Sequence, residues 1–314
     1  MTFDTSVVDV QVQRSFSSTE TNTSASTGKE NMLPSEDSNE GLARHGSPYK
    51  EVSTDELYDQ WASTYDTDGN ILQFVDDLQM RNLMEQFVRL CSSRTLANDT
   101  GRLDILDLGC GTGRNTLKLL QSPWPSSVET FIYGWDGSQA MLDIGRSKCA
   151  DVHHSTPDRQ FGALFEVVDI SDPANVPEQC DSFFSGLIST LVLEHIKIET
   201  YFAITARVLK PGGYALITNM HSDMGRLSRA GYKTASGERI KGTSYIYTPA
   251  ETVEAAAAAG LELVGEAGEA AVDEWMFGEE DVGHGERGKV AERARKWVGT
   301  KVWYGMVLRK RGFW

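Results

Sequence analysis

The amino-acid sequence predicts an α/β protein built on one mostly parallel sheet. Short apolar runs alternate with amphipathic stretches at helical spacing, which is typical of parallel strands joined by crossover helices. The first of these runs leads into a glycine-rich turn and then a helix. An apolar share of 40%, with seven Trp, twelve Phe and ten Tyr among 314 residues, is enough for one sizeable core.

Seven apolar runs have the length and composition of strands, and four helices follow from their start signals. The strands are expected at residues 103–108, 130–135, 165–168, 182–188, 214–218, 262–265 and 302–308. Helices begin near Arg114, Ser138, Ile198 and Thr248. The last start is the clearest, because Thr248 can cap it, Pro249 suits its first turn and Glu251 completes a capping box.

The chain divides into a tail and one folded domain. Residues 1–49 are rich in Ser and Thr and poor in large apolar groups, so they are expected to be disordered. Residues 50–314 form the domain, which opens with a helical lid capped at Ser53. Acidic residues and then a basic amphipathic helix over 287–297 indicate a C-terminal insertion around 266–298, either a solvated segment or a functional lid.

Charge and cysteine usage exclude several classes of function. Thirty basic and forty-five acidic residues give a net charge of −15, which disfavours nucleic acid as a partner. No run is long and apolar enough to span a membrane, and the N-terminus has no secretory or transit pattern, so we expect a protein of the cytosol, with the nucleus also open. The four cysteines form no CxxC pair, so we expect no metal site and no disulfide framework.

The glycine-rich turn carries the most specific chemical signal. It places Gly109, Gly111 and Gly113 directly after a buried strand that ends with Asp107. A dinucleotide fingerprint requires its third glycine one residue later, where this chain has Arg114. An acid at this point would repel a phosphate and suits a ligand with a cationic amine and a sulfonium.

These residues form the run DLGCGTG, which resembles motif I of the class I S-adenosylmethionine-dependent methyltransferases. The resemblance continues in order from about residue 57 to 264. The opening YDQWASTYD is similar to that of a YDxWAxxYD subgroup, which includes the Williams–Beuren region methyltransferase-like protein. The resemblance implies a Rossmann-like, doubly wound, seven-stranded sheet whose last strand is antiparallel, with S-adenosylmethionine as the cofactor.

The resemblance also implies roles for particular residues. Asp136 would accept both ribose hydroxyls, Asp169 and Ile170 would contact the adenine, and the opening helix would close over the cofactor. Each has a plain alternative: a turn for the glycines, a helix cap for Asp136, a loop acid for Asp169 and core packing for the aromatic residues. The whole implied cofactor set is Tyr58, Trp61, Tyr65, Asp107, Gly109, Cys110, Gly111, Gly113, Asp136, Gly137, Ser138, Met141, Asp169, Ile170, Ser189 and Thr190.

Methyl transfer requires alignment of the acceptor with the methyl carbon and the sulfur, together with a base for an acceptor that carries a proton. His221, after the fifth strand, and His195, after the fourth, are the candidate catalytic residues, with structural roles as the alternative. The predicted acceptor is a small or medium organic molecule, neutral or cationic. A regulatory protein that only binds the cofactor, or a protein methyltransferase, remain as competing hypotheses.

Overall fold

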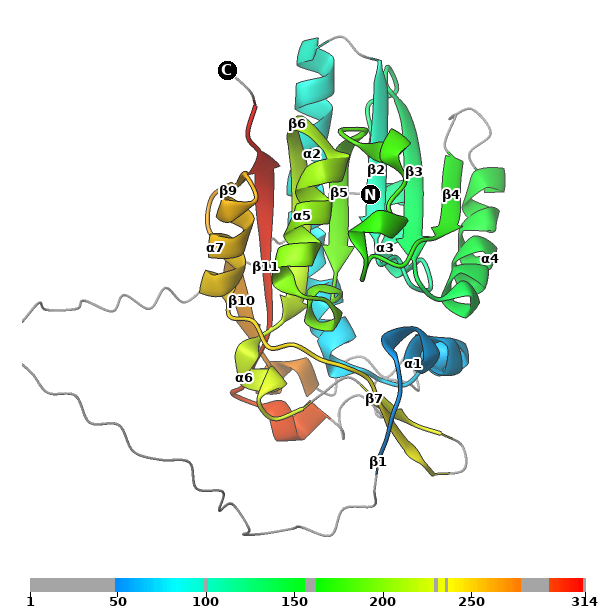
Figure 1. The fold of residues 1–314 in the computed structure, drawn as a ribbon, viewed down its shortest axis with the longest axis vertical. Helices are drawn as coiled ribbons and strands as arrows, with labels where there is room; N and C mark the ends of the chain where they lie inside the picture. Colours follow the sequence, from blue (N-terminus) through cyan, green and yellow to red (C-terminus); the bar gives the residue numbers. More distant parts are fainter. Residues whose placement is uncertain are drawn as a thin grey trace, which may run out of the picture. The chain divides into compact units, whose positions relative to one another are not determined.

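The computed structural model of the chain describes residues 49–98, 101–155, 162–228, 231–234, 237–277 and 294–312. The tail predicted over residues 1–49 lies outside these ranges except for its last residue. Most of the basic helix predicted over 287–297 lies outside them as well. Within the described ranges, strands and helices alternate along the chain, and one large sheet contains most of the strands (Figure 1).

Eight strands form the large sheet, in the order β10-β11-β6-β5-β2-β3-β4, with β9 paired to β11. The strands from β2 to β6 are parallel to one another, whereas β11 is antiparallel to β6, β9 and β10. This confirms the mostly parallel sheet with an antiparallel last strand. The strand bounds are Arg102–Leu108 (β2), Glu129–Asp136 (β3), Gly162–Val167 (β4), Phe184–Thr190 (β5), Leu209–Met220 (β6), Leu261–Leu263 (β9), Gly268–Ala271 (β10) and Lys301–Lys310 (β11).

The sheet has eight strands instead of the predicted seven because a further short strand, β10, follows β9, which corresponds to the strand expected at 262–265. Gly265 has a φ of +79°, which glycine adopts without strain, and it turns the chain between β9 and β10. Both strands pair with β11. The segment predicted as an insertion around 266–298 therefore adds an edge strand to the sheet.

The Pro-Gly-Gly run at residues 211–213 lies inside β6. Leu209 pairs with Phe184, and Tyr214 pairs with Gly186, so the register shifts between these two pairs. The intervening residues of β6 leave the regular ladder as a bulge, and regular pairing with β5 continues from Tyr214 onward.

Helices cover both faces of the large sheet (Figure 1). Side chains of α2, α3 and α4 pack on one face, against residues such as Ile105, and those of α5 and α7 on the other, against residues such as Leu106. Since neighbouring residues of a strand point to opposite faces, β2 is buried on both sides. The helix bounds are Thr54–Trp61 (α1), Ile71–Asn98 (α2), Arg114–Gln121 (α3), Gln139–Ser155 (α4), Ile198–Val208 (α5), Ser222–Gly225 (α6) and Pro249–Ala258 (α7).

Two helix starts have the capping contacts that the sequence indicates. The Oγ1 of Thr248 accepts a hydrogen bond from the amide of Glu251 at 3.2 Å, and the Glu251 carboxylate accepts one from the amide of Thr248 at 2.8 Å. The Oγ of Ser53 accepts a hydrogen bond from the amide of Glu56 at 3.2 Å. These contacts stabilise the first turns of α7 and α1.

None of the helices in the described ranges has the length and apolar character needed to cross a membrane. Short 3-10 turns connect many of the strands and helices. The turns are Ala62–Thr64 (η1), Pro173–Asn175 (η2), Glu178–Cys180 (η3), Leu193–His195 (η4), Glu274–Phe277 (η5) and Arg295–Trp297 (η6).

A second, three-stranded sheet holds the N-terminal helix in place. It consists of β1 (Tyr49–Glu51), β8 (Arg239–Lys241) and β7 (Gly231–Lys233), in that order. Leu57 and Trp61 of α1 pack against Ile240 of β8, and all three side chains are buried. The opening helix is therefore fixed by a segment that lies almost 180 residues later in the sequence.

The side chain of Asp76 connects four elements of the domain: α2, α3, β6 and β11. Its side chain is fully buried in α2. Oδ2 lies 2.7 Å from Nη2 of Arg114 in α3, and Oδ1 accepts hydrogen bonds from Thr218 of β6 at 2.6 Å and Trp303 of β11 at 2.8 Å. Arg114 also contacts Asp77, at 2.5 Å. The charge of Asp76 is thus compensated and both of its oxygens have partners.

We predict that Asp76→Ala lowers the free energy of unfolding by about 3 to 5 kcal/mol, because it leaves the mostly buried Arg114 and two donors without this partner. Asp143→Ala is the matched control, since Asp143 forms an exposed ion pair with Arg146 at 2.8 Å and its loss should cost about 0 to 1 kcal/mol. Urea unfolding followed by circular dichroism measures both. Equal midpoints for the two variants would contradict the assigned role of Asp76.

Candidate functional site

The carboxyl ends of β2, β3, β4 and β5 meet at one edge of the large sheet, and a cavity of about 330 Å³, here called the first cavity, opens there. Residues that follow each of these strands line it, together with residues of α1. Most of the predicted cofactor residues lie around it: Tyr58, Tyr65, Gly109, Gly111, Asp136, Gly137, Ser138, Met141, Asp169, Ile170 and Thr190.

The other predicted cofactor residues, Trp61, Asp107, Cys110, Gly113 and Ser189, do not line the first cavity. Asp107 and Ser189 lie beneath it and hold its lining in place. Oδ2 of Asp107 accepts a hydrogen bond from Thr116 at 2.6 Å, and Ser189 donates one to the carbonyl of Leu108 at 2.9 Å. Burial raises the pKa of Asp107 to about 7. The hydrogen bond from Thr116 acts in the opposite direction, because it favours the charged form of Asp107.

The glycine-rich loop folds tightly between β2 and α3. Gly109 has a φ of +72°, and a Cβ there would lie 2.3 Å from a methyl carbon of Val192. Gly113 has a φ of +75°, and a Cβ there would lie 3.0 Å from the Cα of Gly145 in α4. At Gly111 a Cβ would meet nothing within 4 Å, so the backbone of this residue is open to the first cavity.

Asp136 is a carboxylate held in place by backbone amides. Oδ2 accepts a hydrogen bond from the amide of Gly111 at 2.8 Å, and Oδ1 accepts one from the amide of Ser138 at 2.9 Å. Burial raises the pKa of Asp136 to about 6, although both amides favour its charged form. Each oxygen keeps a further lone pair, so the group can accept two more hydrogen bonds from a ligand in the first cavity.

Side chains near α1 link the opening helix to the loops of the first cavity. Oδ1 of Asp59 accepts a hydrogen bond from Ser138 at 2.5 Å, and Oδ1 of Asp66 accepts one from Thr112 at 2.7 Å. Asp66 also forms an ion pair with Lys148 of α4 at 2.7 Å. The helix and the residues after it therefore lie against the two loops that follow β2 and β3.

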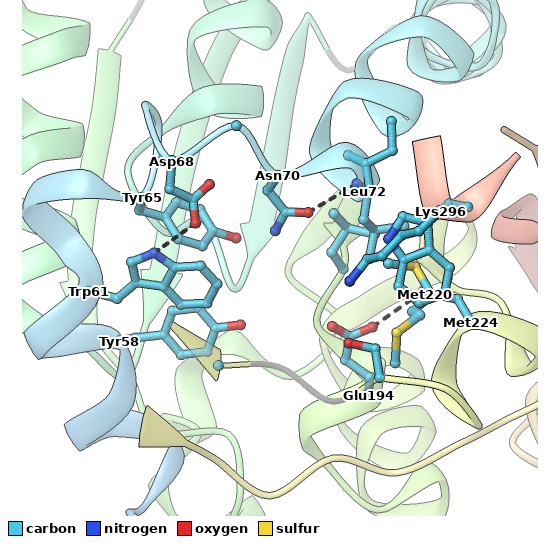
Figure 2. A pocket seen from close by; sticks show the side chains of 16 residues that line it. Tyr58, Trp61, Tyr65, Asp68, Asn70, Leu72, Glu194, Met220, Met224 and Lys296 are labelled. Carbon is cyan, nitrogen blue, oxygen red and sulfur yellow. Dashed lines mark hydrogen bonds between the residues drawn. The ribbon is translucent and has the colours of Figure 1, made fainter. Parts of the chain in front are cut away.

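A second cavity, of about 300 Å³, adjoins the first, and Figure 2 shows the side chains that line it. The two share Tyr58, Tyr65 and Leu191 in their linings. Leu191 has a φ of +59°, a conformation that is rare for a leucine and that is often found at functional sites. The remaining lining residues include Trp61, Glu194, Met220, Met224, Lys296 and Trp297.

His195 lies at the first cavity and contacts the opening helix. Its Nε2 is 2.7 Å from the hydroxyl of Tyr58, and its Nδ1 is 3.3 Å from the carbonyl of Thr243. A carbonyl only accepts hydrogen bonds, so this network assigns the proton to Nδ1 and leaves Nε2 to accept the Tyr58 hydroxyl. Burial raises the pKa of Tyr58 well above its usual value, which keeps the phenol protonated.

His221 lies elsewhere, among the buried side chains at the start of α6. Its Nδ1 accepts a hydrogen bond from the amide of Asp223 at 3.1 Å, and its Nε2 lies 3.2 Å from Oε1 of Glu269 in β10. It lines neither the first nor the second cavity. Both ring nitrogens thus have protein partners, and a catalytic role for His221 stays a prediction.

Sequence reasoning missed some of the residues around the cavities. Glu194 stands beside His195 in the chain but was given no role, although it is buried and lines the second cavity. Leu191 and Val192 were missed as well, since apolar residues after a strand carry no distinguishing signal. The sequence feature that could have indicated Leu191, Val192 and Glu194 is their position directly after β5, whose carboxyl end faces the first cavity.

Known proteins with similar sequences identify the family. A family model of the methyltransferase domain matches residues 105–213. An uncharacterized methyltransferase of Emericella nidulans is 40% identical over 271 residues, which cover 81% of this chain and 90% of that protein. The chain belongs to the class I S-adenosylmethionine-dependent methyltransferases.

Other relatives of this methyltransferase are more distant. A demethylmenaquinone methyltransferase of Clavibacter sepedonicus is 28% identical over 176 residues, covering 56% of this chain and 61% of that protein. Among solved structures, an S-adenosylmethionine-dependent methyltransferase from Methanosarcina mazei is 16% identical, with a TM-score of 0.46, and covers 67% of this chain and 93% of that one. The methyl donor of the enzyme is S-adenosylmethionine, as the sequence predicts.

We predict that Gly109→Ala destabilises the methyltransferase by about 2 to 5 kcal/mol. A left-handed φ costs an alanine about 1 to 2 kcal/mol, and displacement of Val192 adds about 1 to 3 kcal/mol. Gly260→Ala is the control, because Gly260 has a φ of +83° and a Cβ there meets nothing within 4 Å. Thermal unfolding compares the two, and an equal loss would show that contact with Val192 is unimportant.

Proposed function

We propose that this methyltransferase transfers a methyl group to a small or medium organic molecule in the second cavity, with S-adenosylmethionine in the first. One observation carries the proposal: two cavities of about 330 and 300 Å³ adjoin each other and share Tyr58, Tyr65 and Leu191. A volume of this size suits a compact metabolite and not a folded protein surface. The predicted subgroup with the YDxWAxxYD opening fits this arrangement, because the shared tyrosines belong to that motif.

The residues of the first cavity fit the cofactor chemically. Asp136 has free acceptor positions for the two adjacent ribose hydroxyls, and the backbone at Gly111 leaves room for close approach. Asp169 and Ile170 lie at the same cavity, where they would contact the adenine. The cofactor, when bound, supplies a methyl group made electrophilic by the sulfonium, so these residues only have to orient it.

The protein then aligns the acceptor and excludes water. Such positioning lowers the barrier by up to about 7 to 11 kcal/mol. For an acceptor that must lose a proton, we infer that Tyr58 passes it on. The Tyr58 oxygen takes the proton of the acceptor while its own proton passes to Nε2 of His195, which lies 2.7 Å from that oxygen. Tyr58 therefore stays a neutral phenol, in keeping with its raised pKa, and His195 acts through Tyr58.

The experiment that tests the proposal identifies the methylated product. The protein is incubated with S-adenosylmethionine that carries a labelled methyl group and with either a small-molecule metabolite extract or a mixture of unfolded peptides. We expect label in small molecules only. Label in peptides would favour protein methylation, and cofactor binding without any labelled product would favour a regulatory role.

We predict that Asp136→Asn lowers the affinity for S-adenosylmethionine about ten- to hundredfold at pH 7.5, because two hydrogen bonds to a charged acceptor are weakened. The pKa of about 6 gives the direction with pH: affinity of the parent protein falls as pH drops from 7.5 to 5.5 and Asp136 gains a proton. The variant should lose that part of the pH dependence. Calorimetry at both pH values measures this, and an unchanged affinity would remove Asp136 from the ribose site.

We predict that His195→Gln lowers turnover about a hundredfold and leaves the affinity for S-adenosylmethionine unchanged. His221→Gln tests the competing hypothesis, in which turnover depends on His221 and not on His195. Rates of label transfer at pH 7.5, together with calorimetry of cofactor binding, distinguish the two hypotheses, and a full rate in His195→Gln would exclude the Tyr58 relay.

A further inference from the structure

Glu194 places a buried carboxylate on the lining of the second cavity (Figure 2). Only 5% of the residue is exposed. Oε2 accepts a hydrogen bond from the amide of Met220 at 3.3 Å, and Oε1 lies 3.4 Å from Nε2 of His195. A buried carboxylate is costly unless a positive charge or several donors compensate it.

His195 supplies a positive charge only when both of its ring nitrogens carry a proton. Nδ1 faces the carbonyl of Thr243, and Nε2 lies closer to the hydroxyl of Tyr58, at 2.7 Å, than to Glu194. With its one proton on Nδ1, the ring has none on the nitrogen that faces Glu194. Across the ranges that the structure describes, no lysine or arginine is recorded within ion-pair distance of Glu194. The exposed Lys296 belongs to the same lining without pairing with it.

Three aromatic rings stand on another side of the same cavity (Figure 2). The rings of Tyr58 and Trp61 are stacked with centroids 5.9 Å apart, and Tyr65 meets both edge to face, at 5.8 and 5.1 Å. Ring faces attract cations, and they do so most strongly where water is excluded. The carboxylate of Glu194 and this ring cluster thus offer a cation two kinds of favourable contact in one cavity.

We propose that the methyl acceptor is an amine that enters the second cavity as an ammonium ion, held by Glu194 and by the rings of Tyr58, Trp61 and Tyr65. This rests on the proposed function. The ammonium first gives one proton to the Tyr58 oxygen, whose own proton passes to Nε2 of His195. The freed nitrogen lone pair forms the new N–C bond while the C–S bond of the donor breaks and its electron pair stays on sulfur. The product is again an ammonium ion.

The experiment measures binding of matched probes to the enzyme loaded with S-adenosylhomocysteine. The probes are an amine series from benzylamine to 4-phenylbutylamine, together with the alcohol and the carboxylic acid of each chain length. We expect at least one amine to bind tenfold or more tightly than its alcohol and acid. Equal binding of an alcohol or acid, or no binding of any amine, would overturn the proposal.

Two pairs of variants connect that preference to the residues. Glu194→Gln keeps an acceptor for Met220 and should reduce the preference for the amine at least tenfold, whereas Glu199→Gln, on the exposed first turn of α5, should leave it intact. Tyr65→Leu should weaken amine binding, and Tyr65→Phe, which keeps the ring, should restore it. A preference for the amine that survives both Glu194→Gln and Tyr65→Leu would overturn the proposal. If Glu194→Gln folds poorly, the comparison of Tyr65→Leu with Tyr65→Phe still provides the test.

The assay with the metabolite extract separates this proposal from the proposed function. Label on oxygen, sulfur or carbon of a small molecule would leave the proposed function standing and overturn the amine acceptor. Absence of any labelled small molecule would contradict both. Label on nitrogen, lost in Glu194→Gln and kept in Glu199→Gln, would support both.

Discussion

The contacts of the buried Asp76 side chain fix the elements that surround both cavities. The side chain holds the first turns of α2 to the start of α3 through Arg114, and to β6 and β11 through Thr218 and Trp303. The glycine-rich loop ends where α3 starts, and the residues just before Asp76 line the second cavity. A network centred on a fully buried carboxylate therefore holds the glycine-rich loop and the start of α2 in fixed positions around the two cavities.

Much of the fold follows from local sequence signals. Of the strands that precede the first cavity, β2 and β5 are buried on both faces and stand out in the sequence, whereas β4, at the edge of the sheet, has exposed residues such as Leu164 and Val167. The longest helix, α2, was not predicted. Its buried residues around Val75 pack in one cluster and those from Met80 onward in another, so no single apolar stripe repeats along it. The strand β9 overlaps the strand predicted at 262–265, whereas β10, with four residues, is too short for a period to show.

The candidate site could be predicted in outline because its residues follow the strands in motifs. Their individual positions could not. Asp107 and Asp136 are both acids at strand ends, yet only Asp136 lines the first cavity, because the chain turns at different points after β2 and β3. His221 was the favoured base because it follows β6, but its ring turns toward Glu269, a residue of a strand that the sequence did not predict. Long-range contacts of this kind have no local signature.

Tyr58 and Tyr65 border both cavities, whereas Asp136 borders the first alone and Met220 the second alone. If the donor occupies the first cavity and the acceptor the second, as we propose, recognition of the two ligands is coupled at these tyrosines and at Leu191, which both linings share, and is independent elsewhere. Replacements at positions such as Met220, Met224 and Trp297 would then change the acceptor while the donor is still accepted. Under this proposal the choice of acceptor can change through the lining of the second cavity alone.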